Sequence, residues 1–368
     1  MAQASYSAEQ LAIRQQENSM ISPGRLRPAP GKQDLHDRYW PPVTPFGGLG
    51  GDLARFLALP VSGQASALVA LRHDPDEHGR VLHEYLSVIY AYLFGYRDGP
   101  CTDATDDDLE ISILTGKITL ERELVDYWLA DRPIPDFINQ LDAADYLDEF
   151  AESNPGVTHP LFDFLRDEAT NDQIARFLQC EVVRNEVVDD EVALLVTGLQ
   201  GSQKAVTAAN LWDECGRGRL ENFHTYWLRE LLQATEGWES LTQFRMTFPW
   251  FARITSNVFA ALLTRPAHKL MAYGCFLLSE SWVEPHFRRI LDGMERAGIT
   301  DNGIRIYFAA HVAIDPRHSR ELSDGIRAQR PLLTPAKVQQ VVRGAHLASA
   351  AGVWQFDRML GYLRSFPD

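Results

Sequence analysis

The stretch GIRIYFAAHVAIDPRHSRELS, residues 303–323, combines a helical pattern with a dense set of side chains that bind metals. His311, Asp315 and His318 follow one another at offsets of zero, four and seven, so on an α-helix they fall within about 60° of one another. Two imidazoles and a carboxylate on one face suit iron, manganese or zinc better than calcium. A solvated polar stripe is the alternative, but the apolar residues between the three favour a metal or catalytic role.

Helical patterns extend on both sides of this stretch, and alternating strand patterns are nearly absent. They cover residues 161–199, 205–232, 251–297, 303–323 and 335–366. We therefore predict an all-α fold in which residues 156–368 form a helical bundle.

Two regions precede the predicted bundle. Residues 1–52 are rich in proline and glycine, which favours an arm without a long helix. Residues 53–155 return to helical patterns and predict a separate helical region. Within it, His73 and His78 flank Asp74-Pro75-Asp76, which is typical of a turn, so we expect a solvated loop there rather than a metal site.

Composition narrows the range of functions. The chain has 368 residues, of which 45% are hydrophobic and 23% are charged, as in globular proteins. Its net charge of −15 argues against nucleic acid or an anionic membrane as the main partner. The sequence shows neither a signal peptide nor an apolar run long enough to span a bilayer, and its cysteines lack zinc or disulfide-scaffold spacing. These features predict a cytoplasmic protein.

A second set of candidate ligands lies upstream. Glu214 and His224 are ten residues apart, about 15 Å along a straight helix, which is too far to serve one metal pair. Gly216 and Gly218 lie between them and allow the backbone to leave helical geometry. The alternative is a helix end followed by a new helix, with Glu214 in solvent.

Further carboxylates stand in apolar surroundings. Glu280 follows the run GCFLLS, where an ionised carboxylate is costly without a cation. Glu181 shares the apolar stripe of its predicted helix, although pairing with an arginine at the edge of the core is an equal alternative. With the residues above, these make three imidazoles and four carboxylates on separate helices, the ligand set of a carboxylate-bridged two-metal site. The two Glu-x-x-His pairs of ferritin-like proteins are not found, since this spacing occurs only once, from Glu221 to His224.

Three motifs together resemble the haem-oxygenase-like diiron oxidases and oxygenases. They are NLWDE-x-G-x-G-x5-H at residues 210–224, GCFLLSE at 274–280 and YFAAHVAID-x-x-H at 307–318. The resemblance covers about residues 160–330 and implies a bundle shaped like haem oxygenase that binds two irons instead of haem. It places six residues on the family's metal-ligand positions: Glu214, His224, Glu280, His311, Asp315 and His318. Glu181 falls where the N-oxygenating branch adds a carboxylate, with Glu186 as the alternative.

The wide interval between Glu214 and His224, and the length of chain ahead of the bundle, resemble the N-oxygenating branch. This resemblance implies an oxygenase with two Fe(II) ions per chain that uses O2 to oxidise the amine nitrogen of an amino-acid-like substrate. The product would be an N-hydroxy or nitro compound of natural-product biosynthesis. The resemblance also implies a homodimer, and the sequence shows no flavin or nicotinamide motif, so we expect an external electron donor.

Two other functions compete with this interpretation. The same diiron centre could carry out oxidative carbon–carbon cleavage or desaturation of an amino or fatty acid. Outside the enzymes, the chain could be a helical assembly protein with a vestigial site.

Overall fold

A computed structural model describes residues 51–94, 107–129, 133–236 and 248–366. The side chains of residues 233–236 and 313–316 are not described. All described residues belong to one compact unit. The predicted arm lies outside them, except for residues 51 and 52, which begin the first described helix.

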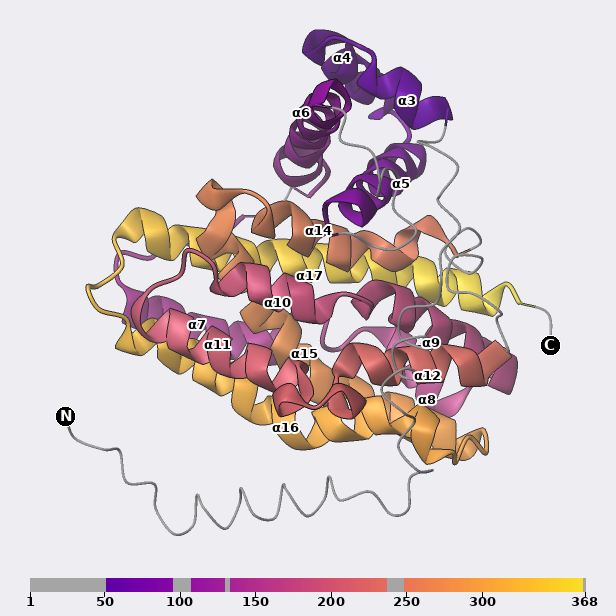
Figure 1. Ribbon diagram of the computed structural model, residues 1–368. Helices are drawn as coiled ribbons and strands as arrows, with labels where there is room; N and C mark the ends of the chain where they lie inside the picture. The colour runs from indigo at the N-terminus through magenta and orange to yellow at the C-terminus, as the bar shows by residue number, and fades with distance from the viewer. Residues whose placement is uncertain (1–50, 95–106, 130–132, 237–247, 367–368) are drawn as a thin grey trace. The chain divides into compact units, whose positions relative to one another are not determined.

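Every regular element of the described residues is a helix, which confirms the all-α prediction (Figure 1). The region before residue 156 contains α3 (Gly51–Leu57), α4 (Val61–Leu71), α5 (Pro75–Leu93), α6 (Asp107–Glu123), the π-helical turn η1 (Leu124–Trp128) and α7 (Gln140–Ser153). The bundle contains α8 (Pro160–Asp167), α9 (Asn171–Asn185), α10 (Val188–Val196), α11 (Gly201–Glu214), α12 (His224–Glu236), α14 (Ile254–Leu263), α15 (Lys269–Arg296), α16 (Asn302–Ala328) and α17 (Pro335–Arg364). Short 3-10 turns connect several of them: η2 (Gly216–Gly218), η3 (Leu220–Asn222), η4 (Trp250–Arg253) and η5 (Pro266–His268). Among all the described residues, no helix has both the length and the hydrophobicity needed to cross a bilayer.

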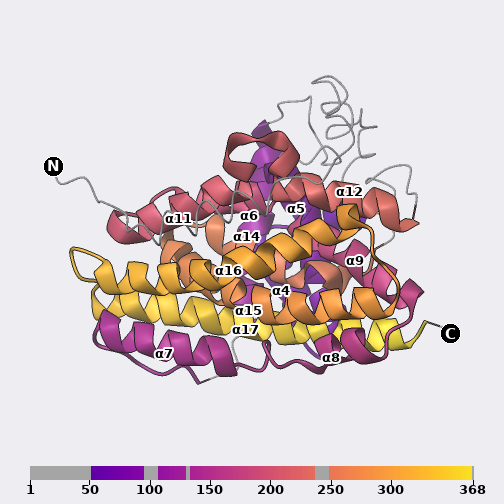
Figure 2. The same ribbon diagram turned by 90° about the horizontal axis from the view of Figure 1, so that it is seen from below.

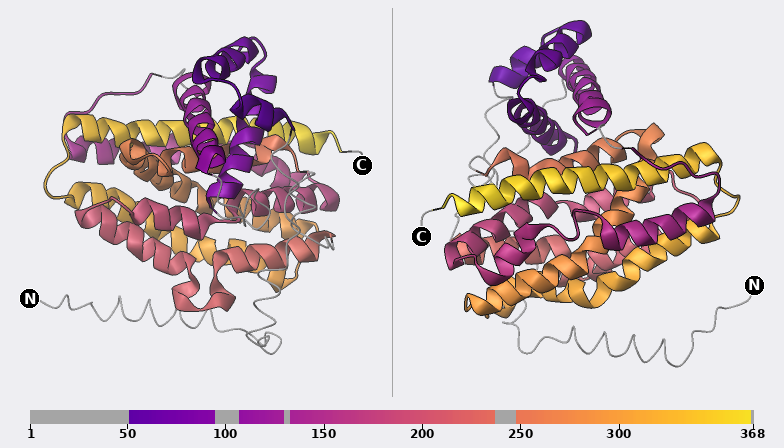
Figure 3. Two further views of the ribbon diagram at one scale, coloured as in Figure 1. Left: turned by 45° about the horizontal axis from the view of Figure 1, so that its top comes forward. Right: turned by 180° about the vertical axis from the view of Figure 1, so that it is seen from behind.

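Helix α15 is the centre of the bundle and packs along both α16 and α17 (Figures 1 and 2). Its residues 271–278 are all buried, because apolar side chains occupy every side of this segment. At its crossing with α17 a Cβ on Gly274 would overlap the Val341 carbonyl, and a Cβ on Gly344 would overlap the Met271 carbonyl. The two glycines therefore let the helix backbones touch. Helices α7 and α8 cover α15 between α16 and α17, as the right-hand view of Figure 3 shows.

Two predicted helical stretches are each divided in the structure. Residues 161–199 form three helices, α8, α9 and α10. Thr170 starts α9 with a capping box, in which the side chains of Thr170 and Gln173 each accept a hydrogen bond from the other residue's backbone N–H group. Residues 251–297 form α14 and α15, separated by the turn that begins at Pro266. Local capping and proline thus end helices that the apolar pattern alone would continue.

The loop predicted around His73 and His78 is found only at residues 72–74, where His73 and Asp74 are exposed. Helix α5 begins at Pro75, and the Asp74 carboxylate caps it by accepting hydrogen bonds from the N–H groups of Asp76 and Glu77. An Asp-Pro pair suits a helix start as well as a turn, because proline at the first helical position lacks only an N–H that would be unbonded there. His78 consequently lies buried on a helix.

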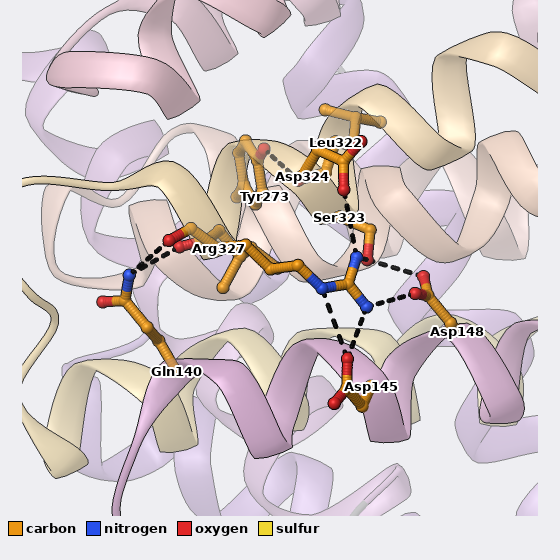
Figure 4. Close-up of polar contacts among 9 residues, drawn as sticks. Gln140, Asp145, Asp148, Tyr273, Leu322, Ser323, Asp324 and Arg327 are labelled. Carbon is orange, nitrogen blue, oxygen red and sulfur yellow. Dashed lines mark hydrogen bonds and ion pairs between the residues drawn. The ribbon is translucent and has the colours of Figure 1, made fainter.

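A polar network fixes the C-terminal end of α16 to α7 (Figure 4). The Arg327 guanidinium donates to Asp145 at 2.7 Å and to Asp148 at 2.5 Å. The Gln140 side chain donates to the Ile326 carbonyl at 2.8 Å and accepts from the Leu333 N–H at 2.8 Å. This network holds the helix whose other half carries three of the predicted metal ligands.

Candidate metal centre

Five of the seven predicted ligand side chains lie in the buried interior between four helices. Glu214 is the last residue of α11, His224 the first of α12, Glu280 lies in α15, and His311 and His318 lie in α16. Their exposed fractions are only 2–8%. Carboxylates and imidazoles are rarely buried this deeply without a partner, so their convergence marks the site.

The turn between α11 and α12 brings Glu214 and His224 together. Gly216, Arg217 and Gly218 have φ angles of 52°, 55° and 81°, which take the chain out of helical geometry. A Cβ on Gly216 would meet the backbone of Asn222, so only glycine fits there. The structure confirms that these glycines break the helix between the two candidates.

Glu214, His224 and His311 form the tightest part of the site. Their ligand atoms lie within 4.8 Å of one another. His224 Nδ1 is 2.7 Å from Glu214 Oε2, yet neither atom has a hydrogen-bond partner among the described residues. His311 Nδ1 donates to the Tyr307 carbonyl at 2.5 Å, which leaves Nε2 as its free ligand atom. Buried ligand atoms that face one another without hydrogen bonds are the arrangement expected where a metal cation binds.

Glu280 and His318 form the neighbouring part of the site. His318 Nδ1 is 3.5 Å from Glu280 Oε2, and its Nε2 is 3.1 Å from Asp213 Oδ2. Asp213 in turn accepts a hydrogen bond of 2.7 Å from Arg217. A carboxylate on the far nitrogen fixes the ring of a metal-binding histidine, so Asp213 orients His318 toward Glu280.

Burial sets the charge state of these groups. It lowers the pKa of His224 to about 4 and of His311 to about 3, helped by neighbouring imidazoles. Both rings are therefore neutral at pH 7, the form that binds metals. Burial raises the pKa of Glu214 and Glu280. Burial also opposes ionisation of Asp213, but hydrogen bonds from His318 and Arg217 outweigh it and lower the pKa of Asp213 to about 2.

The structure places the other candidates differently. The side chain of Asp315 lies outside the described residues, although its backbone belongs to α16. Glu181 is buried on α9, where its carboxylate is 3.4 Å from Arg184, and Glu186 lies 3.1 Å from Arg253. Neither carboxylate belongs to the group around Glu214. Their roles as ligands stay predictions.

Asp189 approaches the site although sequence reasoning did not select it. It lies in the first turn of α10 and accepts a hydrogen bond of 3.4 Å from Thr225, the residue after His224. Burial, and then the charge of Glu214, raise the pKa of Asp189. Acidic residues in the first turn of a helix are ordinary dipole partners, so the sequence signal for Asp189 is weak.

Buried glutamate and histidine side chains gathered from several helices are typical of helical non-haem iron proteins. Residues 175–353 match the model of a family described as iron-containing redox enzymes. The bundle is thus similar to the haem-oxygenase-like iron-containing redox enzymes, which confirms the family resemblance seen in the sequence. The matched residues include all seven predicted ligands.

A solved structure of a CADD-like protein of unknown function from Nostoc punctiforme PCC 73102 is similar to the chain. The two are 15% identical, and the match covers 61% of this chain and 96% of that chain with a TM-score of 0.48. None of the curated proteins matches the sequence significantly.

Proposed function

We propose that the chain is a non-haem diiron oxygenase that uses O2 to oxidise the amine nitrogen of an amino-acid-like substrate to an N-hydroxy or nitro product. One observation carries the metal part of this proposal. Glu214 Oε2 and His224 Nδ1 are buried, 2.7 Å apart and without hydrogen-bond partners among the described residues. The choice of an amine nitrogen rests on the resemblance to the N-oxygenating branch.

The donor atoms divide into two neighbouring sets. Glu214, His224 and His311 would hold one iron, and Glu280 and His318, with Asp315 from the same helix, would hold the second. The charges of Glu214 and Glu280 act on each other, as expected of two sets that share one centre. Iron bound there would supply the reduction of O2, with electrons from an external donor.

The surrounding residues orient the ligands and exclude water. The Tyr307 carbonyl and the Asp213 carboxylate each hold one imidazole nitrogen and leave the other for metal. The ring of Tyr307 lies 4.4 Å from that of His311, and the Trp227 ring stacks on His224 at 5.3 Å. Apolar walls of this kind protect a reactive centre from solvent.

Asp189 is better placed than Glu181 or Glu186 to supply the further carboxylate of the N-oxygenating branch. Of these three carboxylates, Asp189 is the one that interacts electrostatically with Glu214. Glu181 and Glu186 instead lie beside arginines. Comparing iron content in Asp189→Asn and Glu181→Gln distinguishes them. We expect the larger loss of iron in Asp189→Asn.

The proposal also includes a homodimer formed through the helical region of residues 53–155. Size-exclusion chromatography with light scattering tests this part separately. A monomer at micromolar concentration would contradict it without affecting the metal centre.

Anaerobic loading with Fe(II), followed by exposure to 18O2 in the presence of candidate amines, tests the central claim. We expect about two irons per chain, as in the helical carboxylate-bridged proteins, and 18O on the product nitrogen by mass spectrometry. An alkene or a shortened carbon chain would indicate desaturation or carbon–carbon cleavage instead. A folded chain that binds no iron would favour an assembly role.

A further inference from the structure

Arg217, in the turn between α11 and α12, has a strained backbone. Among the described residues it is the only one other than glycine with a positive φ angle, at φ 55° and ψ 38°. In this left-handed conformation the Cβ atom of an L-residue approaches the following carbonyl oxygen, so glycine adopts it at much lower cost. The glycines on either side, Gly216 and Gly218, also have positive φ angles. A side chain at position 217 is therefore not required by the backbone, and strain of this kind is typical of functional sites.

The side chain of Arg217 holds one oxygen of a buried carboxylate. Its Nε donates to Asp213 Oδ1 at 2.7 Å, while Asp213 Oδ2 lies 3.1 Å from His318 Nε2. The χ2 torsion of an aspartate is broad, so contacts to both oxygens are needed to fix the plane of the carboxylate. His318 turns its other nitrogen, Nδ1, toward Glu280 Oε2 at 3.5 Å. The orientation of this candidate ligand therefore depends on a contact two residues removed from it.

A second arginine contacts the same carboxylate but cannot replace Arg217. Arg317 lies 3.3 Å from Asp213 Oδ2, the oxygen that also faces His318, and it contacts Glu321 at 3.2 Å. Of the contacts that Asp213 makes with described residues, only that of Arg217 reaches Oδ1. Arg217 is thus the residue that stops the carboxylate from rotating away from the imidazole.

We propose that Arg217 is a positioning residue of the candidate metal centre, whose strained backbone places the guanidinium against Asp213 so that Asp213 holds the His318 ring ready to bind metal. This inference rests on the proposed function, because it takes His318 as a metal ligand. Its consequence is that position 217 controls two properties in opposite directions. The left-handed conformation makes the turn less stable, whereas the guanidinium that it positions strengthens metal binding.

Two variants separate these properties. Arg217→Ala and Arg217→Gly both remove the guanidinium, but only the glycine variant also removes the backbone strain. Titration of the metal-free chain with Co(II), in competition with a chelator of known affinity, measures metal binding without catalysis. We expect both variants to bind Co(II) about 10-fold more weakly than the wild type, the lower end of the effect of an outer partner of a ligand. In urea unfolding of the metal-free chain, Arg217→Gly should be more stable than Arg217→Ala.

Rescue and a matched control complete the test. Arg217→Lys keeps a positive charge and should retain part of the Co(II) affinity, and guanidinium ion added at non-denaturing concentration should restore part of it in Arg217→Ala. A general folding defect would produce neither rescue. Arg219→Met removes an exposed arginine of the same turn, which has an ordinary φ of −112°, and should keep the wild-type affinity.

The possible failures are distinguishable. Wild-type Co(II) affinity in Arg217→Gly would show that only the backbone of the turn matters and would overturn the role of Arg217. Equal stability of the glycine and alanine variants would overturn the claim that strain is stored at this position. A wild-type chain that stays folded but binds no Co(II) would reject the metal centre of the proposed function as well.

Discussion

The two halves of α16 use polar side chains in opposite ways. Near its C-terminal end, Arg327 and the facing Gln140 of α7 donate to carboxylates and carbonyls, so both side chains have partners within the protein itself. Near its middle, His311 and His318 face Glu214 and Glu280, and in that cluster Glu214 Oε2 and His224 Nδ1 have no hydrogen-bond partner among the described residues. The first arrangement joins two helices, whereas the second gathers the types of ligand atom that bind a metal cation.

A single buried atom without a partner does not define a site. His83 Nε2 on α5 is also buried without a hydrogen bond to the described residues, but aromatic rings surround it, with Trp128 at 5.0 Å and Trp250 at 5.9 Å. Within the described part of the chain, His83 belongs to no group of three metal-binding side chains. The site is marked by several such atoms that converge from different helices.

The largest effect on iron binding and O2 consumption is expected from removing a ligand of the candidate metal centre. His311→Ala should lower iron-dependent O2 consumption by about 100-fold or more, since even the outer partner of a ligand is worth 10–100-fold. Iron content by inductively coupled plasma mass spectrometry should fall with it, while circular dichroism stays unchanged. Arg327→Met is the matched control on the same helix and should keep its iron. Full iron content in His311→Ala would remove His311 from the ligand set.

Removing the residue that orients a ligand should have a smaller effect. Asp213→Asn keeps the shape of the side chain but loses the charge that holds His318, so iron affinity should fall about 10–100-fold. Competition with a chelator of known affinity measures this change. Asp324→Asn, which alters an exposed partner of Arg327, is the control and should leave the affinity unchanged.

Acid should destabilise the chain through buried imidazoles that have no ligand role. Burial lowers the pKa of His83 to about 3 from the ordinary value of 6.5. The unfolded chain therefore takes up this proton as the pH falls below 6.5 and the native chain does not, so stability is lost between pH 6.5 and 3. The loss at pH 5 is about 2 kcal/mol for this residue.

Urea unfolding of the metal-free protein at pH 7 and pH 5 measures this contribution. His83→Gln should show a smaller loss of stability between the two pH values than the wild type, by about that 2 kcal/mol. Equal losses in the two proteins would mean that His83 does not stay neutral in the native state.

The smallest effect on stability is expected where the C-terminal end of α16 meets α7. Arg327→Met should lower the free energy of unfolding by about 1 kcal/mol, because the partners of Arg327 are largely exposed and exposed ion pairs contribute little. Urea unfolding measures the loss, and iron binding should be unaffected. A loss of iron in this variant would show that the two halves of α16 are coupled.

Much of the fold could be predicted from local patterns. The helical periodicity identified the all-α class, and offsets of zero, four and seven correctly placed His311 and His318 on one helix. The glycines at 216 and 218 also predicted the turn before His224. Helix boundaries were less predictable, because Thr170 and Pro266 end apolar patterns that periodicity alone would continue.

The sequence by itself determined which residues could bind iron, since residue type and spacing depend only on the local chain. The tertiary structure alone decided how Asp213 and Glu214 divide their roles, one toward His318 and the other toward His224. Adjacent carboxylates are chemically alike, and only the packing of distant helices determines what each one faces. The same reason explains why Asp189 was recognised only when its surroundings in space were known.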